Sequence, residues 1–250
     1  FHAGITRLFD LNGYGSRAAT QRLLSQIEHF QPDVIWLHNL HGYYLNIELL
    51  FKWLKEHSQI KILWTLHDCW AFTGHCAHFS AAKCDRWKSG CGDCPQLKAY
   101  PKTYGADHTQ RNYRQKQACF TGLANLTIIV PSEWLARTVK QSFLKEYPVE
   151  VVHNQIDKSL FKPTPSDFRE QYGLDGKTVI LGLASVWDKE KGLLDFCRLR
   201  EKLDSRFAIV LVGVTDKQKS RLLPGILALP RTANPGELAE IYSAADVFVN

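Results

Sequence analysis

The stretch IKILWTLHD, residues 60–68, decides the fold class of this chain. Apolar residues fill most of its first seven positions, without the regular polar alternation of a strand that faces water. Such runs are typical of a parallel strand covered on both faces of a sheet. Six similar runs lie at residues 33–39, 126–132, 149–154, 178–185, 207–214 and 245–250. The chain is therefore predicted to contain parallel sheets.

The segments between these runs repeat apolar residues every three or four positions, which predicts amphipathic helices. Alternating strands and helices form βαβ units, and 250 residues are enough for two domains of ordinary size. We therefore predict an α/β fold of two doubly wound parallel-sheet domains. Residues 157–177 carry two prolines and two glycines among many charges and are predicted as a linker. The domains are then expected at 1–156 and 178–250.

The composition is that of a soluble globular protein, with 45% apolar and 22% charged residues. A net charge of +6 favours anionic partners such as nucleotide phosphates, nucleic acid or an acidic membrane surface, without choosing among them. The basic residues are scattered, so we expect no nucleic-acid groove. No apolar run is long enough to cross a bilayer, and no signal peptide is recognisable. The chain starts without Met and stops inside a predicted strand, so we expect an internal fragment.

Two loops are the best places for chemistry, because ligands of open α/β sheets bind beyond the carboxyl ends of the strands. His67 and Asp68 end the run quoted above. The loop SVWDKEKG, residues 185–192, brings lysines to the start of a predicted helix, and free backbone N–H groups there favour an anion such as a diphosphate. A hydrogen-bonded turn and a solvated charged loop are the plain structural alternatives.

Several common sites are not indicated. No GxGxxG follows the first strand and no Walker A sequence occurs, which counts against dinucleotide oxidoreductases and P-loop nucleotidases. Ser132 lacks the GxSxG context of a hydrolase nucleophile, and its position before a predicted helix indicates an N-cap.

A cysteine-rich segment, residues 69–105, interrupts this regular pattern. Its central cysteines follow the spacing C-x7-C-x6-C-x2-C and are Cys76, Cys84, Cys91 and Cys94. Four converging thiolates are the ligand set of a tetrahedral structural zinc site, so we predict zinc here, with His75 or His78 as substitute ligands. Disulfides and plain buried thiols are the alternatives. A closed site of four ligands would brace the loop and would leave no position for a substrate.

The sequence resembles glycosyltransferases of the GT-B fold, specifically glycosyltransferase family 4, over nearly all of its length. The motifs that carry the resemblance are LHNLHGYYLN, WTLHDCWAFTGHC with the later cysteines, VPSEWLA, HNQIDKSLFKP, ASVWDKEKGLLDF and ELAEIYSAADVFVN. The first two motifs are typical of a subgroup that assembles bacterial surface polysaccharides.

The resemblance implies a retaining transfer of a sugar from a nucleotide-diphosphate donor to the hydroxyl of a saccharide or lipid-linked acceptor, with no catalytic metal. It implies that His67 contacts the donor sugar as the catalytic residue. The implied donor-binding residues of the rear domain are Ser185, Lys189, Lys191, Gly192, Arg231 and Thr232, of which the last two follow a late strand. The implied acceptor-binding residues of the front domain are Asn39, His41 and Tyr43.

The sequence also departs from the family pattern. Ser185 and Val186 stand where the family often has Gly-Arg, and Gln155 stands where it usually has Gly. The glycine-rich loop near the family's start and the acidic motif after the last strand are not in the chain, so we expect it to be inactive alone. We expect a cytoplasmic protein that can attach peripherally to the inner face of the membrane. The rival hypothesis is a non-catalytic, zinc-braced module that binds nucleic acid or protein.

Overall fold

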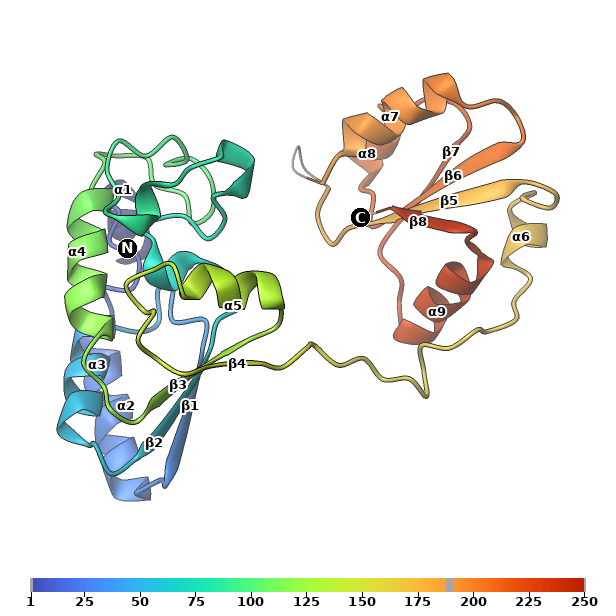
Figure 1. Cartoon of the computed structure of the whole chain (residues 1–250). Helices are drawn as coiled ribbons and strands as arrows, with labels where there is room; N and C mark the ends of the chain where they lie inside the picture. Colours follow the sequence, from blue (N-terminus) through green and yellow to red (C-terminus); the bar gives the residue numbers. More distant parts are fainter. Residues whose placement is uncertain (1, 188–190, 250) are drawn as a thin grey trace. The chain divides into compact units, whose positions relative to one another are not determined.

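The computed structural model describes residues 2–187 and 191–249 and divides the chain into two compact units, Phe1–Asn154 and Gln155–Asn250. Each unit contains one sheet of four strands, and every strand pair is parallel (Figure 1). The division falls two residues before the end that we expected for the first domain.

The first sheet has the strand order β1-β2-β3-β4. Its strands are β1 (Val34–His38), β2 (Lys61–Thr65), β3 (Leu126–Val130) and β4 (Val149–Val151). Each strand lies within a run that the sequence predicted. β1 and β4 are the outer strands. Within the described part of the chain, β1 therefore has a paired strand, β2, along one of its two edges.

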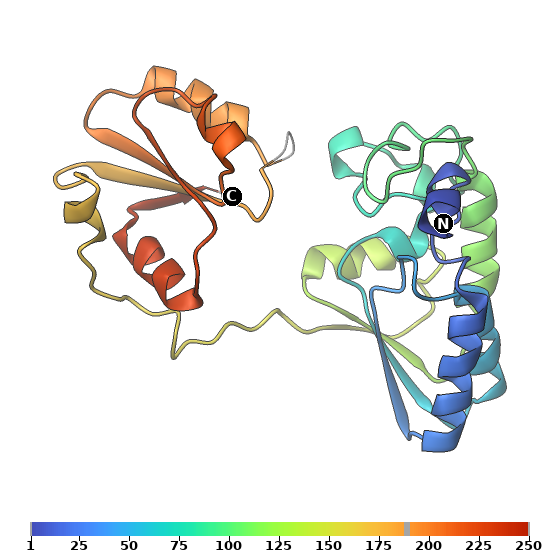
Figure 2. The same cartoon turned by 180° about the vertical axis from the view of Figure 1, so that it is seen from behind.

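The helices of the first unit are α1 (His2–Leu8), α2 (Arg17–Phe30), α3 (Ile47–Glu56), α4 (Thr109–Phe120) and α5 (Glu133–Val139). Three short 3₁₀ turns, Trp70–Phe72, Ser80–Ala82 and Arg86–Lys88, lie in the cysteine-rich segment. Helices α2, α3 and α4 lie side by side on one side of the sheet (Figures 1 and 2). The Ser132 hydroxyl accepts a hydrogen bond from the N–H of Leu135, so Ser132 is the predicted N-cap.

The core of the first unit is built around three aromatic rings. Phe51 of α3, Trp64 of β2 and Phe120 of α4 are at most 1% exposed. Their ring centroids are 4.5 to 5.3 Å apart in tilted or edge-on arrangements, which suit the quadrupoles of aromatic rings. These contacts join two helices to the sheet and so fix the strand ends that follow.

Only one face of the first sheet is well covered, which corrects the expectation of strands buried on both faces. Val34 and Trp36 of β1 are 47% and 61% exposed, whereas Leu37 between Trp36 and the strand end is buried. The physical reason is that helices α2, α3 and α4 pack on the same side, so alternate residues of β1 face away from them.

The second sheet has the order β7-β6-β5-β8. Its strands are β5 (Thr178–Leu183), β6 (Phe207–Val212), β7 (Ile226–Leu229) and β8 (Val247–Val249). Its helices are α6 (Phe168–Gln171), α7 (Leu193–Lys202), α8 (Asp216–Lys219) and α9 (Pro235–Ala244). The strand β7 is the late strand that Arg231 and Thr232 follow.

Both faces of the central strands β5 and β6 are buried, as the sequence predicted, whereas the predicted burial of the last run is wrong because the outer strand β8 is exposed. Leu181 and Val210 pack with Ile241 of α9 on one face, while Ile209 on the opposite face packs with Phe196 of α7. Helices α7 and α9 accordingly lie on opposite sides of this sheet (Figure 1). Phe168 of the expected linker is also buried in the α9 face, so α6 packs as part of the second unit.

Among the described residues, no helix combines the length and the apolar character that crossing a bilayer requires.

Replacing Phe51 by Ala should lower the unfolding free energy of the first unit by about 3 to 5 kcal/mol, because a buried aromatic ring is lost and a cavity remains. Urea unfolding followed by tryptophan fluorescence measures this, since six of the seven tryptophans lie in the first unit. The matched control is Phe30→Ala, whose ring is 79% exposed and whose loss should cost less than about 0.5 kcal/mol. Equal losses for both variants would contradict this core.

Candidate functional site

The carboxyl ends of β1 and β2 bring two loops together in the first unit. Parallel pairing places His38 opposite Thr65, so the residues after both strands leave the sheet at the same edge. Asn39 and His41 follow β1, and His67 follows β2. These three predicted site residues line one small cavity of about 10 Å³, which has room for about one water molecule and not for a sugar.

His41 is held firmly inside this edge. Its Nε2 donates to a carboxylate oxygen of Asp68 at 2.9 Å, and the Tyr100 hydroxyl lies 3.2 Å from its Nδ1. Since a carboxylate only accepts hydrogen bonds, a neutral His41 carries its proton on Nε2 and accepts from Tyr100 at Nδ1. The imidazole and the carboxylate are only 10% and 16% exposed. Both ring nitrogens are therefore engaged, and His41 is an oriented group.

Asp68 is the anion of this arrangement. Burial raises the pKa of its carboxyl, but hydrogen bonds from His41 and from the N–H of Trp70 outweigh burial and hold the pKa below its ordinary value. Asp68 is consequently ionised at neutral pH and anchors the His41 imidazole.

His67 is exposed and has a different environment. Its Nε2 lies 3.0 Å from Nδ1 of His38, and the two rings stack with centroids 5.3 Å apart. One of these imidazoles donates and the other accepts. Nδ1 of His67 has no hydrogen bond to any residue in the described part of the chain, so it can meet a ligand.

Tyr43, the third predicted acceptor-side residue, has a partner in α1. Its hydroxyl accepts a hydrogen bond from Nε of Arg7 in α1 at 2.9 Å, and Tyr43 does not line the cavity. Asn39 is exposed and has a left-handed backbone with φ of 31°. Its carbonyl accepts from the hydroxyl of Tyr44 at 3.0 Å.

A buried lysine supports the cysteine-rich segment, and the sequence analysis missed it. Nζ of Lys116 in α4 donates to the carbonyls of Trp70 at 2.8 Å and Thr73 at 3.0 Å, and it stands 3.4 Å from the centroid of the Trp70 ring. Complete burial lowers the pKa of Lys116 to about 7. The spacing of the sequence could have indicated its burial, because Lys116 lies four residues before the core residue Phe120 and so on the same face of the helix.

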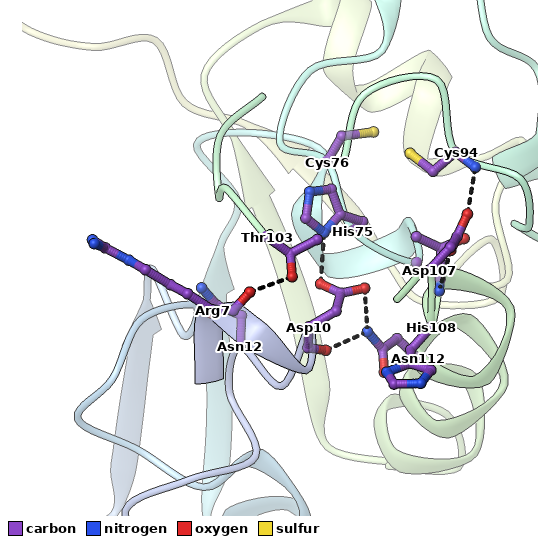
Figure 3. A network of polar contacts seen from close by, with 12 residues as sticks. Arg7, Asp10, Asn12, His75, Cys76, Cys94, Thr103, Asp107, His108 and Asn112 are labelled. Carbon is purple, nitrogen blue, oxygen red and sulfur yellow. Dashed lines mark hydrogen bonds and ion pairs between the residues drawn. The ribbon is translucent and has the colours of Figure 1, made fainter. Parts of the chain in front are cut away.

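A second buried network joins α1, the cysteine-rich segment and α4 (Figure 3). Nδ1 of His75 donates to one carboxylate oxygen of Asp10 at 2.7 Å, and the side-chain amide of Asn112 donates to the other at 2.9 Å. The His75 and Asp10 side chains are 1% and 3% exposed. Nε2 of His75 is buried and has no hydrogen-bond partner among the described residues.

The four central cysteines converge on the other side of this imidazole. Together with His75 they line a cavity of about 20 Å³, and none of them forms a disulfide. The thiols of Cys76 and Cys94 hydrogen-bond to each other. His78, the other substitute ligand that we considered, is exposed and does not line this cavity. The described side chains form no group of three or more donors already arranged around a metal position.

The predicted donor-binding residues of the second unit lie beyond β5 and β7. The Arg231 guanidinium donates from Nε to the carbonyl of Ser185 at 3.0 Å and from a terminal nitrogen to the same oxygen, so two loops are tied together. Thr232 follows Arg231 and is half-buried. Lys189 lies outside the described residues.

Lys191 and Gly192 lead into helix α7. Lys191 is exposed, and Gly192 is the N-cap of the helix with a left-handed φ of 71°. A side chain at that φ would be strained, which explains the glycine. Trp187, the last described residue before this point, is buried, and its Nε1 donates to the carbonyl of Val212 at 2.9 Å. The cation therefore stands beside the free N–H groups of a helix start.

A hollow also lies at the opposite edge of this sheet. A hollow of about 580 Å³ is lined by Lys177, Arg200 and Phe207 among others, at the amino ends of β5 and β6. Ligands of parallel sheets bind at the carboxyl ends instead, and the start of α7 is at that edge. We therefore keep the loop before α7 as the candidate anion site.

Comparison with known proteins gives consistent matches. The family model described as Glycosyltransferase Family 4 matches residues 2–160. A protein of Escherichia coli (strain K12) that is named as a colanic acid biosynthesis glycosyl transferase, WcaC, is 35% identical over 99 residues, which are 38% of this chain and 24% of that protein.

Solved structures match over most of this chain. Sucrose-phosphate synthase from Thermosynechococcus elongatus matches with a TM-score of 0.59 at 16% identity. The match covers 92% of this chain and 52% of that protein. Anabaena Alr3699/HepE in complex with UDP-glucose has a TM-score of 0.52 at 16% identity, with 92% of this chain covering 55% of it. The chain thus spans about half the length of these two structures and about a quarter of the E. coli protein.

Replacing Asp68 by Asn should lower the unfolding free energy of the first unit by about 1 to 3 kcal/mol at neutral pH, because charged hydrogen bonds are lost. The folded pKa of Asp68 is depressed, so its stabilisation is present above the ordinary value of 3.8 and is lost as the pH falls below it. The difference between the two proteins should therefore shrink near about pH 3.

Urea unfolding at both pH values tests the Asp68 prediction. Asp85→Asn is the control, because the Asp85 side chain is 79% exposed and its pairing with Lys88 should contribute little. A difference for Asp68→Asn that stays constant with pH would show that the ionised carboxylate is not responsible.

Proposed function

We propose an activity from one established premise: the chain belongs to Glycosyltransferase Family 4. Its two four-stranded parallel units are those of the GT-B fold, as the sequence predicted. We propose that the protein transfers a sugar from a nucleotide-diphosphate sugar to an acceptor hydroxyl in polysaccharide biosynthesis, with retention of configuration. Family membership favours this enzyme over the non-catalytic binding module.

The observation that carries the proposal is the cationic loop at the start of α7. The diphosphate that leaves the donor sugar accumulates negative charge as the glycosidic bond breaks. Lys191, the N–H groups at the start of α7 and Arg231 on the neighbouring loop are the groups that would stabilise that charge. Ser185, Gly192 and Thr232 complete the proposed donor site, and Lys189 stays a sequence-based prediction.

The solved structures support a nucleotide-diphosphate donor. Alr3699/HepE has been described in complex with UDP-glucose, with UDP, and with UDP and glucose. At 16% identity these matches show the fold, so the proposal of a diphosphate donor for this chain rests on the charge of its own loop. The proposed donor chemistry needs no catalytic metal, because lysine and the helix start supply the positive charge.

In the first unit, we propose that His67 contacts the donor sugar. Nδ1 of His67 has no hydrogen bond to the described residues and can serve a hydroxyl, while His41 is oriented by Asp68. The adjoining cavity is too small for a sugar, so the acceptor would lie over the exposed edge that Asn39 and His67 form. Tyr43 stays a predicted acceptor-binding residue, and its hydroxyl is bonded to Arg7.

The polysaccharide context comes from the relative that is named for colanic acid biosynthesis. We propose a saccharide or lipid-linked acceptor and a cytoplasmic protein that attaches peripherally to the inner face of the membrane. The net charge of +6 supports attraction to anionic lipids.

A screen of nucleotide sugars with the full-length enzyme, recording release of the nucleoside diphosphate, tests the function directly. With the preferred donor, Lys191→Ala should raise the donor KM and lower kcat, reducing kcat/KM by about tenfold or more through the lost charge. The control is Lys202→Ala, an exposed lysine at the other end of the same helix. If both variants keep wild-type kinetics, Lys191 is not in the donor site. If no nucleotide sugar turns over or binds, the proposed function is wrong.

His67→Ala should reduce kcat by about 10- to 100-fold, which corresponds to about 1 to 3 kcal/mol for a lost hydrogen bond in the transition state. The side chain is exposed, so the unfolding free energy should change little. His29→Ala, an exposed histidine in the last turn of α2, is the control for activity. Parallel loss of activity and stability in His67→Ala would instead indicate a structural residue.

A further inference from the structure

The cysteine-rich segment brings distant residues to one enclosed place. Cys76, Cys84, Cys91 and Cys94 span 19 positions of irregular chain, and all four line the same cavity with His75. The volume of about 20 Å³ admits a single ion or water molecule and excludes a sugar or nucleotide. Four of its lining residues are cysteines, whose sulfur binds water weakly and soft metal ions strongly, and Phe79, Arg86, Trp87 and Thr109 also line it.

Backbone N–H groups already point at two of the sulfurs. The N–H of Gly74 donates to Sγ of Cys91 at 3.1 Å, and the N–H of Gln96 donates to Sγ of Cys94. Such bonds stabilise the thiolate, which is the form that ligates a metal.

A third observation is the unpartnered nitrogen of His75. The imidazole is nine-tenths buried and is fixed by the bond from Nδ1 to Asp10, so Nε2 stays on the wall of the cavity without a partner in the described residues. Figure 3 shows the sulfurs of Cys76 and Cys94 pointing toward one another beside this ring. A buried polar atom without a partner in the protein requires an explanation, and a bound ion with its ligands supplies one.

We propose that Cys76, Cys84, Cys91 and Cys94 bind one Zn²⁺ ion as four thiolates in a closed tetrahedral site. Four sulfurs satisfy the coordination preference of zinc completely, with Zn–S distances of about 2.3 Å. His75 directly precedes Cys76 in the chain, which makes it hard for both to reach one ion. We therefore place His75 outside the ligand set, as a neighbour of the site.

Binding requires two changes from the arrangement described here. All four thiols, including those of Cys76 and Cys94 that now bond to each other, lose their protons to solvent, and the sulfurs converge on one point. Four thiolates and Zn²⁺ carry a net charge of −2. The amino group of the buried Lys116 lies close enough to Cys76 and Cys91 to interact with them electrostatically.

The site would stabilise the surroundings of His41 without taking part in chemistry. Tyr100, whose hydroxyl bonds to His41, and Asp68 stand on either side of the cysteines in the chain. A closed site leaves no position for substrate, so the proposed role is structural. This inference does not depend on the proposed transferase activity.

Metal analysis of the full protein tests the proposal. Protein without a polyhistidine tag, purified in reducing buffer without chelators, should contain about one zinc per chain by inductively coupled plasma mass spectrometry. Exchange with Co²⁺ should give thiolate-to-cobalt charge-transfer absorption and the intense visible bands of a tetrahedral site. Removal of the metal should lower the melting temperature of the first unit.

Variants test the ligand set. Cys91→Ser should lose the zinc, while the control Cys197→Ser, in α7 of the second unit, should keep it. His75→Gln should also keep the metal, with altered cobalt bands. If Cys91→Ser does not fold, the zinc content of the wild-type protein still decides the question.

Three results would overturn the proposal. The first is metal-free wild-type protein whose four thiols react freely with a thiol reagent. The second is a mass lower by two hydrogens for each disulfide among these cysteines in non-reducing conditions. The third is a His75→Gln variant that loses the metal while Cys84→Ser keeps it, which would replace the assigned ligand set. None of these results depends on the transferase assay, so failure of the activity and failure of the metal site are distinguishable.

Discussion

Parallel pairing of β1 with β2 is the constraint on which the site of the first unit depends. Because both strands run in the same direction and His38 stands opposite Thr65, the residues that follow must leave at one edge. Helix α3 carries the chain back to the opposite edge, where β2 begins. The loops after β1 and β2 therefore meet at the carboxyl edge. The aromatic core of Phe51, Trp64 and Phe120 fixes the sheet against its helices, and the positions of His41 and His67 follow from that packing.

Buried charge is the second requirement, because the cysteine-rich segment has little regular structure to satisfy its backbone. Lys116 supplies two hydrogen bonds to carbonyls of this segment, and Asp10 accepts from both His75 and Asn112. Each of these groups loses water on folding, which is unfavourable unless its partners are retained. Polar contacts therefore hold the loop that carries Tyr100 against α1 and α4. Through the contact of Tyr100 with His41, they also restrain the edge where β1 and β2 end.

Strands and helices could be predicted from the sequence because their periodicity is local. The two-sided burial of β5 and β6 follows from their continuous apolar runs, and Ser132 from its place before a helix. The exposure of Trp36 could not be predicted, because it depends on which side the neighbouring helices pack. Tyr43 and Lys116 have partners about 36 and 46 positions away, and no periodic pattern encodes such pairs.

The outer position of β1 has a consequence for the behaviour of the chain in solution. Along the edge away from β2 its backbone N–H and C=O groups have no strand beside them in the described residues, and Val34 and Trp36 add exposed apolar surface. Such an edge is a template for β-sheet extension, in which another strand adds by main-chain hydrogen bonds. We therefore expect this chain to self-associate at high concentration unless a further strand covers the edge of β1.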